Sequence, residues 1–239
     1  MTFPLALLLA LSLPGASPVD THRLVSLLEA RYRSAHTLQA TFLERYSENG
    51  QVVRAEAGEA YFRRPGKMRW EYVSPEKNLF LVDGKTAWFY VPEDHTVTRA
   101  PAKQSTDWRT PLALLAGEMK LSRICARIEI TSAVQPDTPG NVVLYCPLRG
   151  ESSNSTQSGQ AVSAGQNPGA GPEDSVYLDV VPDTGDLARV LVREKGGVEV
   201  EFKFANWRFD PSIPDTMFRF DVPRGVAIVN GESLVESTP

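Results

Sequence analysis

Apolar residues recur at two different spacings along the chain. Near the start the spacing is helical, and it places on one stripe Leu24, Leu27, Leu28 and Tyr32. Asp20 or Thr21 can cap this helix, which is predicted over residues 20–36. From Thr37 onward the spacing becomes two residues, as in strands with one buried face. This alternation predicts strands at 38–46, 52–62, 67–73, 78–82, 85–91, 95–100, 123–131, 141–147, 175–181, 187–194, 198–208 and 217–222.

Two turns between these strands can be assigned from the sequence. Asp83 and Gly84 separate two apolar runs and form a typical hairpin turn. The second turn follows from side-chain parity, because a three-residue loop at 195–197 keeps the apolar residues of both strands on one face. That register places Val192 opposite Val200 and Val190 opposite Phe202.

The strand pattern is interrupted once, by an apolar segment with helix signals. Thr110 can cap a short helix, Pro111 suits its first position and Gly117 ends it. The helix is apolar on most faces and therefore needs an apolar surface to cover. The sequence thus predicts a mainly β fold of about 11–12 antiparallel strands, curled into a barrel or half-barrel with two apolar helices available to fill its concave side.

Three segments set the expected domain organisation. An apolar run within residues 1–16 is too short to span a bilayer and has the length of a signal-peptide core, although no Lys or Arg precedes it. We expect cleavage near Ala16 and export of the remainder. Residues 17–239 are expected to form a single domain, since the strands after 174 are too few for a second core. Residues 151–174 are rich in Ser, Gly, Gln and Pro and predict a disordered loop.

The two cysteines, Cys125 and Cys146, lie in strand-like runs on either side of a turn-rich segment. A hairpin centred between Gln135 and Pro136 would place them directly opposite each other. In an oxidising compartment this arrangement predicts a cross-strand disulfide that stabilises the fold.

Charge and chemistry narrow the functional classes. The net charge of −4 argues against nucleic acid as a partner. The three histidines lie far apart, and neither metal-ligand spacing nor a nucleophile, phosphate or dinucleotide motif is present. We therefore expect no cofactor, no metal and no enzymatic activity.

The stretch "YFRRPGKMRWEY" at 61–72 consists of two apolar-aromatic strand ends around a turn, with paired arginines just before a proline. It begins a region rich in large side chains, which are Tyr61, Met68, Trp70, Tyr72, Phe80, Trp88, Phe89 and Tyr90. These residues are either ordinary sheet core or an apolar concave surface under a helical cover. The second arrangement would bind lipid or acyl chains.

The segment "GEAYFRRPGKMRWEYVSPEKNLFLVDGKTAWFYVPEDHTV" at 58–97 resembles the LolA family of periplasmic lipoprotein carriers. Its matching features are Gly58, Arg64-Pro65, Arg69-Trp70, Asp83-Gly84-Lys85, Trp88-Phe89-Tyr90 and Pro92. The resemblance continues through "TPLALLAG" and "NWRFDPSIPDTMFRFDVPRGVAI". Family members have an unclosed β-barrel with helices over its mouth.

The resemblance implies a role for individual residues. Arg64 matches the arginine that hydrogen-bonds backbone carbonyls of the covering helices, whereas Arg63 is expected to lie in water. The acyl-chain cavity is expected to include Met68, Trp70, Phe80, Phe89, Leu112 and Leu115. The implied partners are acylated lipoproteins, an inner-membrane ABC transporter that releases them and an outer-membrane acceptor, with the carrier itself monomeric.

Three alternatives to a carrier stay open. The related outer-membrane acceptor is itself a lipoprotein, and the absence of a cysteine before Cys125 counts against it. A periplasmic sensor of similar shape usually has a further domain, for which this chain is short. A lipid-modifying enzyme would need a nucleophile and a base that the sequence does not suggest.

Overall fold

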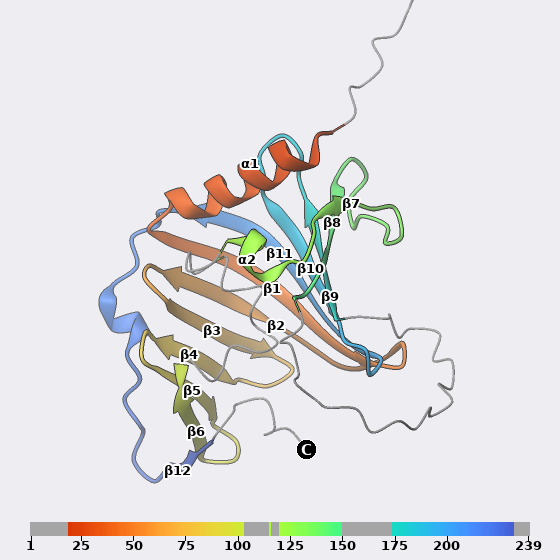
Figure 1. Ribbon diagram of the computed structural model, residues 1–239. Helices are drawn as coiled ribbons and strands as arrows, with labels where there is room; N and C mark the ends of the chain where they lie inside the picture. The colour runs from red at the N-terminus through yellow and green to blue at the C-terminus, as the bar shows by residue number, and fades with distance from the viewer. Residues whose placement is uncertain (1–18, 103–114, 116–119, 150–173, 232–239) are drawn as a thin grey trace, which may run out of the picture.

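A single curled sheet of 12 strands forms the framework of the protein (Figure 1). The computed structural model describes residues 19–102, 115, 120–149 and 174–231. The order of strands across the sheet is β12-β6-β5-β4-β3-β2-β1-β11-β10-β9-β8-β7. The strands in the first half of the chain are β1 (Thr37–Glu48), β2 (Gln51–Arg63), β3 (Lys67–Ser74), β4 (Leu79–Asp83), β5 (Thr86–Val91) and β6 (Thr96–Pro101). Those of the second half are β7 (Glu129–Ile130), β8 (Val142–Pro147), β9 (Ser175–Val180), β10 (Leu187–Arg193), β11 (Val198–Phe209) and β12 (Ala227–Asn230).

Strand β1 lies near the centre of the sheet, between the long strands β2 and β11. β1 pairs with β2 through a tight turn in which Asn49 and Gly50 both have positive φ. On its other side β1 pairs with β11, which comes from far along the chain. The predicted register of the β10–β11 hairpin is confirmed, because Val192 lies opposite Val200 and Val190 opposite Phe202.

Helix α1 (Thr21–Ser34) lies across one end of the concave face of the sheet (Figure 1). Of the two candidate caps, Asp20 is the N-cap, and its side chain accepts a hydrogen bond from the His22 backbone N–H at 3.1 Å. Leu24, Leu28 and Tyr32 are buried in the core beneath the helix. The predicted helical stripe therefore faces the sheet.

A glycine allows the sheet to pack tightly at its centre. Gly58 on β2 lies between Phe42 on β1 and Tyr72 on β3. A Cβ at this position would lie 1.9 Å from the Glu71 carbonyl oxygen and 3.0 Å from Cε1 of Phe42. The rings of Phe42 and Tyr72 meet edge to face over the glycine, with centroids 5.1 Å apart.

Two predicted strands of the second half and the predicted direction of strand pairing are wrong. Residues 123–131 do not form one strand, because a helical turn, α2 (Leu121–Ile124), precedes the short strand β7. Residues 217–222 are not a strand, because Pro214 leads into the 3-10 turn η3 (Asp215–Phe218), and β12 follows later. β12 also pairs in parallel with β6, whereas the sequence predicts only antiparallel strands.

The expected fold class is otherwise confirmed as a mainly β, unclosed sheet with few helices. The predicted signal peptide, the helix at 110–117 apart from Leu115, and nearly all of the predicted loop at 151–174 lie outside the described residues. Within the described part of the chain, no helix has the length and apolarity to cross a membrane.

Candidate functional site

The concave face of the sheet carries a continuous aromatic layer centred on Trp70. Its ring centroid lies 4.7 Å from that of Phe42, 5.7 Å from Phe62 and 5.5 Å from Phe202. Strands β1, β2, β3 and β11 each contribute to this layer because alternate residues of each strand point to the same face. Trp70 is only 2% exposed, and its indole Nε1 has no hydrogen-bond partner.

The residues predicted to line an acyl-chain cavity divide into three groups. Trp70, Phe80 and Leu115 are buried in the core. Met68 and Phe89 are half-buried and pack against the same core. Leu112 lies outside the described residues. Apolar side chains from the sheet and helix α1 thus pack against one another at this face.

Tyr32 fixes the last turn of α1 to the sheet. Its hydroxyl accepts a hydrogen bond from the Leu187 backbone N–H at 2.8 Å. Its ring meets those of Trp207 and Phe209, with centroids 5.2 Å and 5.7 Å away. Burial strongly raises the pKa of the Tyr32 hydroxyl, which therefore stays protonated.

Arg64 connects the β2–β3 turn to the same turn of the helix. Its Nη2 donates a hydrogen bond to the Tyr32 backbone carbonyl, while its Nε is buried with no hydrogen-bond partner. Burial lowers the pKa of the Arg64 guanidinium, nearby Arg33 lowers it further, and Asp210 partly opposes the shift. Among the described residues, no carboxylate lies within ion-pair distance of Arg64. The arginine therefore holds α1 through its backbone, without a counter-charge.

Arg63 does not lie in water, and that expectation is wrong. It points to the opposite, convex face, where it forms an ion pair with Asp215 and donates a hydrogen bond from Nη2 to the Ile213 carbonyl at 2.5 Å. The ring of Phe218 lies 5.8 Å from its guanidinium carbon. The C-terminal segment 211–230 runs past β3 and β4 to β12 (Figure 1). Its residues Ile213, Asp215 and Phe218 make these contacts with the arginine.

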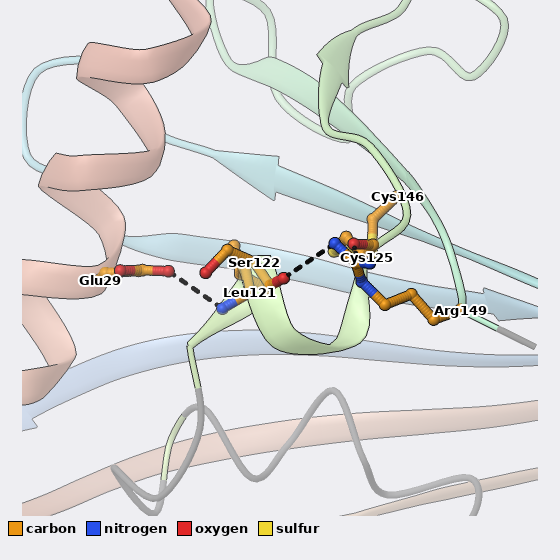
Figure 2. Close-up of a disulfide and its surroundings, with 6 residues drawn as sticks. All are labelled: Glu29, Leu121, Ser122, Cys125, Cys146 and Arg149. Carbon is orange, nitrogen blue, oxygen red and sulfur yellow. Dashed lines mark hydrogen bonds between the residues drawn. A yellow bond between two sulfur atoms is a disulfide. The ribbon is translucent and has the colours of Figure 1, made fainter. Parts of the chain in front are cut away.

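A disulfide joins the short segment next to α1 to strand β8. Figure 2 shows that Glu29 of α1 accepts a hydrogen bond from the Leu121 backbone N–H, at 3.0 Å, where α2 begins. Cys125, directly after α2, forms a disulfide with Cys146 of β8 (S–S 2.05 Å). The predicted hairpin register is wrong, because Cys125 lies opposite Leu148. The β7–β8 pairing is shifted from the predicted register in the same direction, since Glu129 lies opposite Tyr145.

Sequence reasoning missed a polar pair within the concave layer. The Tyr72 hydroxyl donates to Glu44 Oε2 at 2.8 Å, and Glu44 is 4% exposed. A signal was present, since Glu44 is the one charged residue in the alternating set Leu38, Ala40, Phe42, Glu44 and Tyr46. Strand alternation places Glu44 on the concave face with these residues, and its charge is the exception in that set.

A cleft of about 360 Å³ lies on the convex face, under the loop at 133–135. Its charged residues pair with one another. Arg45 Nε lies 3.2 Å from Glu201 Oε2, and Arg193 Nε lies 2.6 Å from Glu199 Oε1. The cleft is lined by Arg45, Ser47, Ala133, Val134, Gln135, Arg189, Leu191, Arg193, Glu199 and Glu201. Among the residues described here, no cluster of His, Cys, Asp and Glu suits a metal ion.

The fold and the site together define an unclosed half-barrel whose concave aromatic face is covered by a helix, which an arginine holds at its last turn. Residues 33–137 match the family described as "Outer membrane lipoprotein carrier protein LolA". Over these residues the chain is similar to the LolA family, as its sequence motifs implied.

Relatives of similar length align with most of the chain. A Nitrosomonas europaea protein is 29% identical over 206 residues, which cover 86% of this chain and 88% of the relative. A Chromobacterium violaceum protein is 28% identical over 230 residues, covering 96% and 98%. Both relatives are named outer-membrane lipoprotein carrier protein.

A solved structure shows the same fold at low sequence identity. It is the crystal structure of an uncharacterized conserved protein from Thermus thermophilus. It is 12% identical, has a TM-score of 0.51 and covers 88% of this chain and 98% of its own. At this identity the likeness concerns the fold alone.

Proposed function

We propose that this protein is a periplasmic carrier that shields the acyl chains of lipoproteins and delivers them to the outer membrane. The acyl chains enter the concave aromatic layer after α1 moves, and the protein returns to the closed form when they leave. An inner-membrane ABC transporter supplies the cargo, and an outer-membrane acceptor receives it. The function requires apolar burial and no covalent chemistry.

The observation that carries this proposal is the way Arg64 holds α1. The link is a hydrogen bond to one backbone carbonyl, with the Nε of a charged group buried and unpaired. A bond from a charged donor contributes about 1.5–3 kcal/mol, and the desolvation of the guanidinium offsets part of it. Such a link closes the empty protein but is weak enough for cargo to displace.

The apolar layer supplies the opposing free energy. Each buried methylene of an acyl chain contributes about 0.8 kcal/mol, so a few methylenes outweigh the Arg64 hydrogen bond. Binding therefore selects the open form, and closure assists release to an acceptor of higher affinity. Similarity to the LolA family and the names of the relatives support this role.

The test is release of lipoproteins from spheroplasts by the purified mature protein. We expect the protein to solubilise acylated lipoprotein and to retain it during purification. Arg64→Leu removes the closing bond, so the variant should retain roughly five- to tenfold more cargo when mixed with an acceptor membrane. Arg63→Leu is the matched control, because it removes the same charge from the convex face and should leave retention unchanged.

Two results would contradict the proposal. One is a folded wild-type protein that releases no lipoprotein from spheroplasts and binds none. The other is an Arg64→Leu variant that retains no more cargo than Arg63→Leu. Circular dichroism on each variant establishes that it is folded before its cargo is compared.

A further inference from the structure

The concave face changes character along its length. Close to α1 it consists of aromatic rings, whereas Glu44 and Tyr72 place a carboxylate and a hydroxyl further along the same face. Phe42 separates the two regions, with its ring 4.7 Å from that of Trp70 and 5.1 Å from that of Tyr72. Beyond Glu44, β1 and β2 lead to a hairpin tip where Glu48, Val52 and Val53 are exposed.

Glu44 is a buried carboxylate in an otherwise apolar alternating set of β1. Its neighbours on adjacent strands are Phe202 of β11 and Glu56 of β2, which lies directly opposite. Like charges at directly opposed positions of a sheet repel each other. A residue that departs from the pattern of its strand in this way is a candidate for a functional role.

The second carboxylate is also held in place. Arg54 Nε lies 2.9 Å from Glu56 Oε2, and these residues belong to the same alternating set of β2 as Gly58. Burial raises the pKa of the Glu56 carboxyl, although Arg54 lowers it in part. The polar region therefore comprises two carboxylates, one arginine and the Tyr72 hydroxyl, and it borders the aromatic layer.

We propose that Glu44, oriented by Tyr72, binds the amide N–H groups at the junction between the acyl chains and the polypeptide of a lipoprotein. The inference rests on the proposed carrier function and specifies how the cargo is oriented. A carboxylate only accepts hydrogen bonds, and an N-acylated cysteine and the peptide group after it present N–H donors. The acyl chains then extend toward α1, and the polypeptide leaves past the β1–β2 hairpin tip.

This arrangement makes a prediction about specificity. The Glu44 carboxylate repels the carboxylate of a free fatty acid but accepts hydrogen bonds from an amide. Because Glu44 is 4% exposed, both ligands reach it only in the open form, so the cost of opening is common to them. The difference between the two ligands therefore reports on Glu44 and not on opening.

The experiment compares a synthetic triacylated lipopeptide with palmitate, each competing with a fluorescent apolar probe. Glu44→Gln retains an oxygen that accepts from Tyr72 but removes the charge. We expect it to weaken lipopeptide binding about tenfold and to leave palmitate binding equal or stronger. Glu59→Gln is the control, since Glu59 alternates away from the concave set and accepts a hydrogen bond from Gln39 at 3.2 Å.

Each outcome of this comparison decides between explanations. Equal weakening of both ligands, or unchanged lipopeptide binding, would overturn the role of Glu44 while leaving the carrier function in place. A wild-type protein that binds palmitate but not the lipopeptide would instead refute both the carrier function and the role of Glu44. Tyr72→Phe keeps the ring and should weaken lipopeptide binding by a smaller factor, about threefold.

The orientation of the cargo is tested with a lipopeptide that bears a maleimide on its peptide portion. Val53→Cys places a thiol at the hairpin tip, and Ser34→Cys places one at the end of α1, both at exposed positions. The natural cysteines are paired in a disulfide and do not react. We expect the adduct to form several-fold faster with Val53→Cys, and the opposite preference would overturn the orientation.

Discussion

Arg63 and Arg64 are neighbours in sequence but hold different parts of the molecule on opposite faces of the sheet. Arg63 fastens the C-terminal segment to the convex face through Asp215, the Ile213 carbonyl and the Phe218 ring. Arg64 holds helix α1 on the concave side through the Tyr32 carbonyl. Both links are thus made by an arginine. Arg63 makes an ion pair, a hydrogen bond and a ring contact, whereas Arg64 makes a hydrogen bond to a backbone carbonyl.

The difference lies in how the charge is compensated. Arg63 has a carboxylate partner, so its attachment combines ion pairing, a hydrogen bond and a ring contact. Arg64 has a neutral acceptor, and burial lowers the pKa of its guanidinium. A charged group with incomplete compensation is easier to detach, because exposure to water restores its hydration. Under the proposed function, the Arg63 attachment is permanent and the Arg64 attachment is the one that cargo releases.

The largest effect is expected from removing the ring that anchors the permanent attachment. Phe218→Ala leaves a cavity where a side chain only 1% exposed is packed. We expect the free energy of unfolding to fall by about 3–5 kcal/mol. Denaturant titration measures this change. A loss below about 1 kcal/mol would mean that the C-terminal segment contributes little to stability.

A smaller loss of stability is expected for Arg63→Leu. The ion pair with Asp215 is partly exposed and contributes little, but the hydrogen bond to the Ile213 carbonyl is lost as well. We expect a decrease of about 1–2 kcal/mol in the free energy of unfolding. Asp215→Asn removes the charge pair alone and should cost less, which apportions the two contributions in the same titration.

Arg64→Leu should change the free energy of unfolding by less than about 1 kcal/mol, because the lost hydrogen bond and the relieved burial of charge offset each other. Local opening should nevertheless increase. Hydrogen exchange at the backbone amides of the last turn of α1 should therefore accelerate, while β10 and β11 stay protected. Unchanged exchange in α1 would show that Arg64 does not hold the helix.

The smallest effect is expected for the pH dependence of stability that comes from Asp83, in the turn between β4 and β5. Burial opposes ionisation of Asp83, but hydrogen bonds from the backbone N–H groups of Thr86 and Lys85 and from Trp88 outweigh it and lower the pKa of its carboxyl. A depressed carboxyl pKa stabilises the fold above about pH 4, its ordinary range, and this contribution is lost as the pH falls through the folded-state value.

The difference in the free energy of unfolding between wild type and Asp83→Asn should therefore be a few tenths of a kcal/mol at about pH 7 and should shrink as the pH falls below about 4. The Arg64 hydrogen bond involves no carboxylate and should not respond to pH over this range. A wild type whose α1 opens on acidification, with Asp83→Asn behaving alike, would contradict this assignment of the pH effect to the turn.

The features that followed from the sequence were those governed by local periodicity. Side-chain parity was sufficient to align Val192 with Val200, because a shift of one residue would expose every apolar side chain. The helical stripe of α1 likewise faces the core as its spacing indicated. The motif around Arg64 led to the family, and the fold class followed from the number and length of the strands.

The features that could not be predicted depend on distant segments. Arg63 was expected in water because its partners, Ile213 and Asp215, lie 150 residues or more away, as the sequence separation of its carbonyl contact shows. Phe218 and Phe220 alternate as in a strand, but Phe220 packs against Trp88 and Tyr90 of β5. Local pattern cannot indicate which face of the sheet such residues will cover.

The central position of β1 has a consequence for folding. The strand pairs with β2 immediately after it, but its other edge waits for β11, which begins at Val198. As the chain emerges from its N-terminus, strands β1 to β6 form a meander whose β1 edge is unpaired until most of the protein has followed. During that interval β1 presents a long template for intermolecular pairing. Conditions that slow the arrival of the second half should therefore favour aggregation through β1, whatever the stability of the finished fold.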